Sequence, residues 1–396
     1  MAKMEEKDNA FMRVVKYLIP WEGDKPSEKI RKLIFIAAAV VLIVTVTILI
    51  INGVNSAKDK EQNSNLANIY SQGGSSSTDS NSSSSDTSSS TSGNSSTNSS
   101  TSSSTNSTSS TSSTSSSTSS GNSSDPYEEK PNAPAVIQGN FEELLAINSD
   151  IVGWLTIDGV VNLPVMQTDD NEYYLTHDFY NNPSKTGALY VDYHNKVTAG
   201  GKPDNTVIYG HNDAGAEYFG GLPNYFNYSI TTGDPNNISF YKNHPTITYN
   251  TIYKNSTYKI FAGILTNVYE EDGAVFPYHT IRSFGSKSDF DNYCANILDR
   301  SNFINPDVDL QYGDKLLTLS TCMWNYGTPS ISAGEAHLRW VLFAREVRDG
   351  ESASVDVSKA YANPDPLFFD AYYNNYAGGS WGGRKWPKDL IKDFAG

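Results

Sequence analysis

The stretch KLLTLSTCMWNYG, from Lys315 to Gly327, joins a strand-like run to a cysteine. Leucine and threonine residues that suit a strand lead into Cys322, and a Trp, a Tyr and a Gly follow it closely. The chain contains only two cysteines, so a cysteine placed where a strand ends calls for a specific role. From these residues alone, the role could be that of a buried core thiol, half of a disulfide, a metal ligand or a nucleophile.

The second cysteine has a different sequence context. Cys294 lies in SDFDNYCANILDR, where Phe290, Tyr293, Cys294 and Ile297 fall on one face of a predicted helix. This spacing predicts a core thiol on an amphipathic helix. An exported domain with two cysteines also permits a disulfide, but the helical pattern makes the Cys294–Cys322 bridge the less favoured interpretation.

An apolar segment near the N-terminus predicts a membrane anchor. LIFIAAAVVLIVTVTILII, Leu33–Ile51, is 19 uncharged residues long, enough at ~1.5 Å per residue to cross a ~30 Å hydrocarbon layer. A cleaved signal peptide is the alternative, but the run exceeds the usual ~7–15 residues and the following NGVNSAKDK is a poor cleavage site. Lysines and arginines crowd its N-terminal side, so we expect a cytoplasmic tail (1–32), a single transmembrane helix (33–51) and an extracellular remainder.

A segment of very low complexity follows the anchor. From Ser71 to Ser124 the chain is almost entirely Ser, Thr, Asn and Gly, with no apolar residue and only Asp79 and Asp86 charged. Nothing there can offset the entropy lost on ordering, so we expect a disordered tether over residues 52–135. As a random coil, ~54 residues would reach about 40 Å, which would lift the following domain away from the membrane.

The charge of the chain narrows the class of partner. The formal net charge of −15 falls on residues 125–396, which hold 34 acidic and 19 basic side chains. An acidic exported domain argues against nucleic acid as a partner. A basic or amine-bearing substrate and a merely solvated acidic surface both stay open.

Residues 136–348 predict one mainly β domain. FEELLAINSDIVGWLTI, from Phe141, predicts a helix that ends near Asn148 and passes into a strand. Short runs rich in Val, Ile, Thr and Tyr then alternate with turn residues: GALYVDY, NTVIYGH, TITYN, YKIFAGILTNVY, KLLTLST and RWVLFAREV. This pattern predicts an all-β barrel or sandwich, with the helix around Cys294 inserted between the last strands. Residues 349–396 are rich in Gly, Pro, Tyr and Trp, and we expect them to form an arm packed on the barrel.

Two further residues could assist a cysteine nucleophile. A free thiol with a pKa near ~8.5 supplies little thiolate at neutral pH, so a neighbouring cation or histidine would be needed. His211 ends the strand-like run NTVIYG, and Arg339 begins the run RWVLFARE. If the strand of Cys322 pairs antiparallel with that of Arg339, a guanidinium could stabilise both the thiolate and a later oxyanion. From spacing alone, purely structural roles for all three residues stay open.

Several other chemistries lack their sequence motifs. The chain has no HExxH and no Cys or His pairs at zinc spacing, so we expect no metal site. It has no GxSxG elbow for a serine hydrolase and no glycine-rich phosphate loop, and we expect no cofactor.

Taken together, TLSTC at Thr318–Cys322, IYGHN at Ile208–Asn212 and LRWVLFARE resemble the sortases, membrane-anchored cysteine transpeptidases of Gram-positive bacteria. INSDIVGWLTIDG, LPVMQTDDNEYYLTHDF and KTGALYVDY resemble class B members in particular. The similarity extends from about Phe141 to Arg348. It implies an eight-stranded sortase β-barrel with an N-terminal helical extension and an inserted helix.

The resemblance also implies roles for residues. Cys322 would attack the carbonyl at a Thr in a sorting motif near the C-terminus of a surface protein, and His211 would protonate the leaving amine and deprotonate the incoming one. Arg339 would hold the substrate and the oxyanion. An amine of a peptidoglycan precursor would release the product. Candidate substrate contacts are Asn171, Leu175, Ser320 and Thr321, for which turn and barrel packing are the alternative interpretation.

One departure and three alternative functions stay open. MWNYGTPSISAGEAH makes the interval between Cys322 and Arg339 long for a class B sortase, which bears on whether Arg339 reaches the sulfur. A hydrolytic cysteine peptidase would use the same residues with water as acceptor. A wall-facing binding module would use the barrel without turnover. A pilus-polymerising enzyme would take a lysine of another protein as its acceptor.

Overall fold

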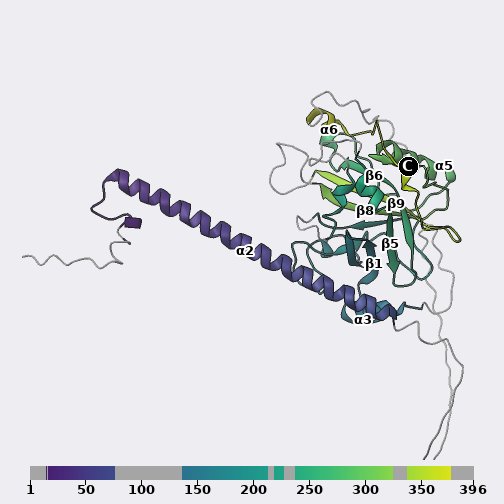
Figure 1. The fold of residues 1–396 in the computed structure, drawn as a ribbon, viewed down its shortest axis with the longest axis horizontal. Helices are drawn as coiled ribbons and strands as arrows, with labels where there is room; N and C mark the ends of the chain where they lie inside the picture. Colours follow the sequence, from purple (N-terminus) through teal and green to yellow (C-terminus); the bar gives the residue numbers. More distant parts are fainter. Residues whose placement is uncertain are drawn as a thin grey trace, which may run out of the picture.

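Eight strands close into a barrel in the order β1–β2–β3–β4–β8–β9–β6–β5 (Figure 1). The computed structural model describes residues 15, 17–75, 136–212, 218–226, 237–323 and 337–375. The barrel strands are β1 (Ile151–Ile157), β2 (Val161–Met166), β3 (Leu189–Val191), β4 (Asn205–Tyr209), β5 (Thr246–Thr251), β6 (Thr257–Asn267), β8 (Leu316–Met323) and β9 (Leu338–Glu346). The prediction of a mainly β barrel is confirmed.

The two strands that pair with β8 determine which distant segments of the chain lie side by side in the barrel. β4 pairs with β8 in parallel, and β9 pairs with β8 antiparallel. Parallel strands cannot be joined by a tight turn, so a long connection must lead from the end of β4 back to the start of β8. That connection contains β5, β6 and the inserted helix α5 (Lys287–Arg300). Segments far apart in sequence therefore end side by side at one edge of the barrel.

Helix α5 covers the outer surface of the barrel, as the sequence pattern predicted. Ser286 caps its first turn by accepting a hydrogen bond from the backbone N–H of Asp289. The apolar face places Phe290, Tyr293 and Ile297 in the main hydrophobic core. Cys294 is buried on the same face, and burial raises the pKa of its thiol. Both cysteines are free thiols, so Cys294 is the core thiol that the helical spacing predicted and the disulfide is not formed.

The N-terminal helix α2 (Pro26–Ser75) includes the predicted anchor and extends well beyond it. Among the described residues, it is the helix long and apolar enough to cross a membrane. Its N-terminal part projects from the barrel, and its C-terminal part lies beside α3 (Glu142–Ile147) (Figure 1). We expected a disordered tether from residue 52. Residues 52–75 are instead helical, because Leu66 and Tyr70 give this part of the helix an apolar face that packs on the barrel. Residues 76–135 lie outside the described residues.

Short elements complete the fold. They are α4 (Ser239–Asn243), α6 (Asp370–Asn375), the 3₁₀ turns η1 (Gly139–Phe141), η2 (Tyr173–Leu175), η3 (Leu222–Tyr225), η4 (Glu270–Asp272) and η5 (Val357–Lys359), and the paired strands β7 (Phe303–Ile304) and β10 (Tyr361–Ala362). In the C-terminal arm, Leu367, Phe368, Phe369 and Tyr372 are buried in the main core. The arm beyond residue 375 lies outside the described residues.

Candidate active site

Cys322 and Arg339 are direct partners across two strands. In the antiparallel pairing of β8 with β9, the Cα of Cys322 lies opposite that of Arg339. Directly opposed residues of an antiparallel pair project their side chains from the same face of the sheet. The loop between them, residues 324–336, lies outside the described residues, but its length does not displace Arg339 from this position. The sequence left open whether Arg339 lies near Cys322, and the strand register pairs the two residues across β8 and β9.

His211 follows the strand on the other side of Cys322. Tyr209 pairs with Ser320, and Gly210 continues the ladder by donating its N–H to the Ser320 carbonyl at 3.3 Å. Just beyond, the Asn212 side chain donates to the Cys322 carbonyl at 2.8 Å. His211 lies between these two contacts, level with Cys322. His211, Cys322 and Arg339 therefore lie side by side on three neighbouring chain segments. We call these three residues the row.

The ring of His211 is held by a backbone carbonyl. Its Nε2 lies 2.8 Å from the carbonyl oxygen of Leu175, at the end of η2. A carbonyl oxygen only accepts, so Nε2 carries the proton and donates it in this bond. This bond does not involve the other ring nitrogen, Nδ1. This bond is compatible with the imidazolium as well as with the Nε2–H tautomer.

The four predicted substrate contacts divide into two pairs. Leu175 is 40% exposed, and Asn171 is half-buried beside it on the same turn. Ser320 and Thr321 are each 2% exposed. Ser320 shares a hydrogen bond of 2.8 Å with the Tyr278 hydroxyl, and Thr321 donates to the Gly210 carbonyl at 2.8 Å. The hydroxyls of this second pair therefore bond within the fold. The Asn171 side chain does so too, to Asp192 and to the backbone N–H of Tyr193, whereas the carbonyl of the partly exposed Leu175 lies against the His211 ring.

Comparisons with known proteins place the barrel in a family. The solved Staphylococcus aureus sortase B–substrate complex is 27% identical over 54% of this chain and 86% of that chain, with a TM-score of 0.44. A sortase B structure from B. anthracis is 25% identical over 54% of this chain and 86% of that chain, with a TM-score of 0.42. No family model matches the chain. Among curated proteins, sortase B of Staphylococcus aureus is 28% identical over 187 residues, 47% of this chain and 68% of the relative. Sortase B of Listeria monocytogenes is 31% identical over 192 residues, 48% of this chain and 70% of the relative.

The chain belongs to the sortase B family. The resemblance that the sequence motifs suggested is thereby confirmed, and a sortase-type function follows from it at the level of the family. Within the described residues of this sortase B-type barrel, no cluster of His, Cys, Asp and Glu could hold a metal ion.

The sequence analysis of this sortase B-type chain missed a group of aromatic residues beside the row. The rings of Tyr190 and Tyr209 lie 5.4 Å apart, and Tyr209 precedes His211 by two positions on the same strand face. Burial is the main cause that raises the pKa of both phenols, so they are neutral at physiological pH. The charges of Cys322 and Arg339 also act on the pKa of Tyr190, with Cys322 raising it and Arg339 lowering it. The alternation in VIYGH could have identified Tyr209, because residues two apart in a strand share a face.

A further segment beside Cys322, which we call the second wall of the site, comes from the connection before α5 and contains Tyr278 and His279. The hydroxyl of Tyr278 reaches Ser320, two positions before Cys322 on the same face of β8. Burial lowers the pKa of the adjacent His279; the charge of Asp192 raises it, but the charges of Arg282 and Arg339 lower it further. No strand pattern marks this segment in the sequence, and only the tertiary fold brings it to the row.

Proposed function

We propose that the protein is a sortase B-type cysteine transpeptidase in which Cys322, His211 and Arg339 are the catalytic residues. The observation that carries this proposal is the row itself, with Arg339 in register opposite Cys322 and His211 level with it on the other side. A nucleophile, an acid–base group and a fixed cation are the three groups that thiol-dependent acyl transfer needs.

The proposed first half-reaction is acylation of the thiol. The Cys322 thiolate attacks the scissile carbonyl of a sorting motif, and a C–S bond forms while the carbonyl oxygen takes the negative charge. The guanidinium of Arg339 stabilises that oxyanion. When the C–N bond breaks, His211 as imidazolium gives its proton to the departing amine, and a thioester remains.

The second half-reaction returns the enzyme to its starting state. An incoming amine of a peptidoglycan precursor attacks the thioester, His211 accepts a proton from that amine, and the C–S bond breaks to release the thiolate. The product is an amide between the surface protein and the wall precursor. Asn171 and Leu175 contact the substrate, while Ser320 and Thr321 keep β8 in place through their internal hydrogen bonds.

We further propose that residues 33–51 of α2 anchor the chain in the cell membrane, with the N-terminus in the cytoplasm and the barrel outside. The apolar length of α2 and the basic residues on its N-terminal side support this topology. The partners are then surface proteins that carry a sorting motif, the wall precursor and the membrane itself.

The test is a peptide-library assay on the full-length protein in detergent, with and without an added amine nucleophile. Mass spectrometry should detect cleaved peptides joined to the amine, and a Cys322→Ala variant should give neither product. Cleavage that is indifferent to the amine would favour a hydrolytic peptidase. Peptide binding without any cleavage by the wild type would favour a non-catalytic binding module.

A further inference from the structure

A buried carboxylate beneath the candidate site has no role in the proposed reaction. Asp192, directly after β3, is 3% exposed. One carboxylate oxygen accepts from the backbone N–H and from Nδ1 of His194, each at 3.0 Å. The other accepts from the Asn171 side chain at 3.0 Å and from the Tyr209 hydroxyl at 3.1 Å. Burial acts to raise the pKa of Asp192, but these hydrogen bonds outweigh it and hold the pKa below its usual range.

The bond to Asp192 determines which way the Asn171 amide points. A carboxylate only accepts, so the amide nitrogen must face Asp192. The amide oxygen then faces the opposite way and accepts from the backbone N–H of Tyr193 at 3.0 Å. An amide nitrogen carries two N–H groups, and these two bonds use only one of them. Asn171 lies just before η2, whose last residue Leu175 holds the His211 ring.

We propose that Asp192 is a positioning residue that presents the second N–H of Asn171 as a hydrogen-bond donor to the backbone of the bound peptide. The proposal rests on the proposed function, which makes the surface above Asn171 and Leu175 a peptide groove. Asp192 touches neither the peptide nor the reacting atoms. Asp192 acts by excluding the flipped orientation of the Asn171 amide, in which the amide oxygen would face the negative carboxylate of Asp192.

Binding to a catalytically inactive chain tests this separately from turnover. In the full-length Cys322→Ala protein, the dissociation constant of a fluorescent sorting-motif peptide is measured for Asp192→Asn, Asn171→Ala and the double variant. Each single change should weaken binding about tenfold, as loss of a charge-assisted hydrogen bond does. The double variant should bind no more weakly than Asn171→Ala, because Asp192 acts through Asn171.

Controls keep the proposal open to refutation if Asp192→Asn fails to fold. His194→Ala removes one donor to the other carboxylate oxygen, the imidazole Nδ1, and keeps the backbone N–H. It should change binding less than twofold. Asn171→Asp places a second carboxylate against Asp192, and it should bind more weakly than Asn171→Ala. Additive losses in the double variant, or an Asn171→Asp protein that binds as well as Asn171→Ala, would overturn the proposal. An active wild type with either result leaves the transpeptidase function standing.

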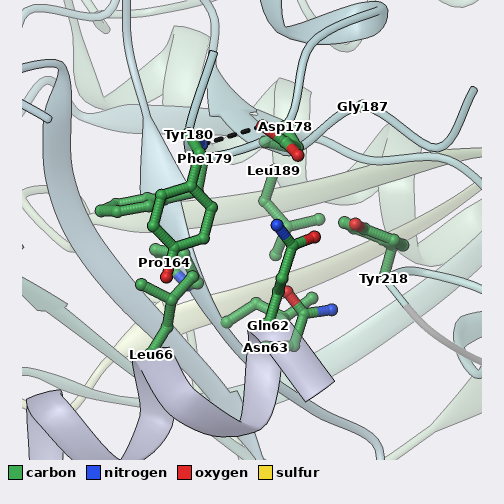
Figure 2. Close-up of a pocket in the computed structure, with 12 residues that line it drawn as sticks. Gln62, Asn63, Leu66, Pro164, Asp178, Phe179, Tyr180, Gly187, Leu189 and Tyr218 are labelled. Carbon is green, nitrogen blue, oxygen red and sulfur yellow. Dashed lines mark hydrogen bonds between the residues drawn. The ribbon is translucent and has the colours of Figure 1, made fainter. Parts of the chain in front are cut away.

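A second, independent observation concerns the docking of α2. Leu66 is 1% exposed against the barrel, and the ring of Tyr70 stacks on Trp154 with centroids 4.4 Å apart. The Asn250 side chain donates to the Tyr70 hydroxyl at 2.8 Å. Figure 2 shows Gln62, Asn63 and Leu66 on the helix facing barrel residues that include Pro164, Phe179 and Tyr218. The first barrel contact comes earlier, where Thr186 donates to Asp59 at 3.3 Å.

The end of α2 also meets the barrel where the chain re-enters it. A Cβ added at Gly73 would lie 2.7 Å from the Cα of Asn140 in η1, closer than a side chain allows. The helix end at Ser75 and the re-entry at Gly139 are therefore neighbours. The residues between Ser75 and Gly139 therefore join two neighbouring points, so their length does not enter the span between membrane and barrel.

We infer that the continuous helix, and not the Ser/Thr-rich segment, sets the height of the barrel above the membrane. From Ile51 to Asp59 a helix rises about 12 Å at ~1.5 Å per residue. The reach of about 40 Å expected from a random-coil tether is replaced by this shorter, rigid spacing.

Energy transfer in nanodiscs tests the spacing. The full chain, with Cys294→Ala, Cys322→Ala and a single label at Asp349→Cys, is measured against acceptors in the lipid headgroups. Deleting residues 80–130 should leave transfer unchanged, whereas inserting seven helix-forming residues after Val54 should raise the barrel by about 10 Å and reduce transfer. A deletion that brings the barrel closer to the lipid, or an insertion without effect, would overturn the inference.

Discussion

At the scale of single residues, the two cysteines differ through their surroundings. Cys294 lies in the core, where burial raises the pKa of its thiol and keeps it protonated. Cys322 is half-buried at the end of β8, with Arg339 opposite. A thiolate is the reactive form, and a nearby guanidinium favours it. One thiol therefore packs in the core, and the other, the proposed nucleophile, lies half-buried at the end of a strand.

The first prediction contrasts these two thiols. Cys322→Ala should remove thioester formation and lower transpeptidation at least ~10³-fold, because no other nucleophile occupies the row. Cys294→Ala should keep the activity and cost roughly 1 kcal/mol of unfolding free energy, since it leaves a small cavity. Peptide kinetics and urea unfolding of both variants measure this, and an active Cys322→Ala protein would contradict the assignment.

The second prediction concerns the shape of the cation at position 339. Arg339→Lys keeps the charge but loses the planar fork, so kcat should fall about 10²-fold with little change in KM. Arg345→Lys is the matched control, since Arg345 lies on the same face of β9 opposite Leu316, in an ion-pair cluster with Asp309 and Glu351. It should lower stability and leave kcat unchanged. Equal kcat losses in both variants would remove the special role of Arg339.

At the scale of elements, a hydrogen bond links the connection between β6 and β8 to β8, the strand that carries Cys322. The Ser320–Tyr278 hydrogen bond joins β8 to the segment that forms the second wall of the site, and both side chains are buried. Removing one partner of a buried bond leaves the other unsatisfied, which costs more than removing both. The bond therefore helps to hold this segment in place, together with the hydrogen bonds that Asn205 and Tyr293 donate to the Tyr278 carbonyl.

The third prediction follows from that asymmetry. Ser320→Ala should lower the unfolding free energy by about 1–3 kcal/mol, because the Tyr278 hydroxyl loses its partner. The double variant Ser320→Ala/Tyr278→Phe should be destabilised by less than the sum of the two single variants. Chemical denaturation of the three proteins checks this, and additive losses would show that the bond has no part in holding the wall.

At the scale of the whole molecule, the ion pairs of a buried arginine stabilise the end of the barrel that is distant from the candidate site. Arg345 is fully buried, and its guanidinium bonds to Asp309 and Glu351, while Lys259 also pairs with Glu351. The hydrogen bond from Arg345 is the largest cause that lowers the pKa of Glu351, and Lys259 adds to it. Arg345 thus stabilises one end of β9 through ion pairs, while Arg339 lies opposite Cys322 at the other end.

The fourth prediction is an acid-dependent loss of stability through Glu351. Its pKa is lower in the folded chain than in the unfolded chain, so the stabilisation is complete above the unfolded value, 4.5 for an unperturbed glutamate. It is lost progressively as the pH falls from there through the folded-state pKa. Glu351→Gln should therefore be less stable at pH 7 and show a flatter decline below about pH 4.5. Unfolding curves from pH 7 to pH 3 measure both slopes, and parallel slopes would contradict the prediction.

The sequence by itself determined the elements and the identity of the main chemical groups. Short runs rich in Val, Ile, Thr and Tyr predicted the strands, and the helical spacing of Phe290, Tyr293 and Ile297 predicted α5. The motifs around Cys322, His211 and Arg339 indicated the family. These are local patterns, because side-chain periodicity and strand-end chemistry are written within a few residues.

Only the tertiary structure decided which distant segments meet. The parallel pairing of β4 with β8 put His211 level with Cys322, and closure of the barrel brought Asp192 and Tyr278 to the same place. The docking of α2 was likewise invisible in composition, since its contacts lie on barrel strands far along the chain. Long-range register depends on the packing of the whole barrel, so no local pattern carries that information.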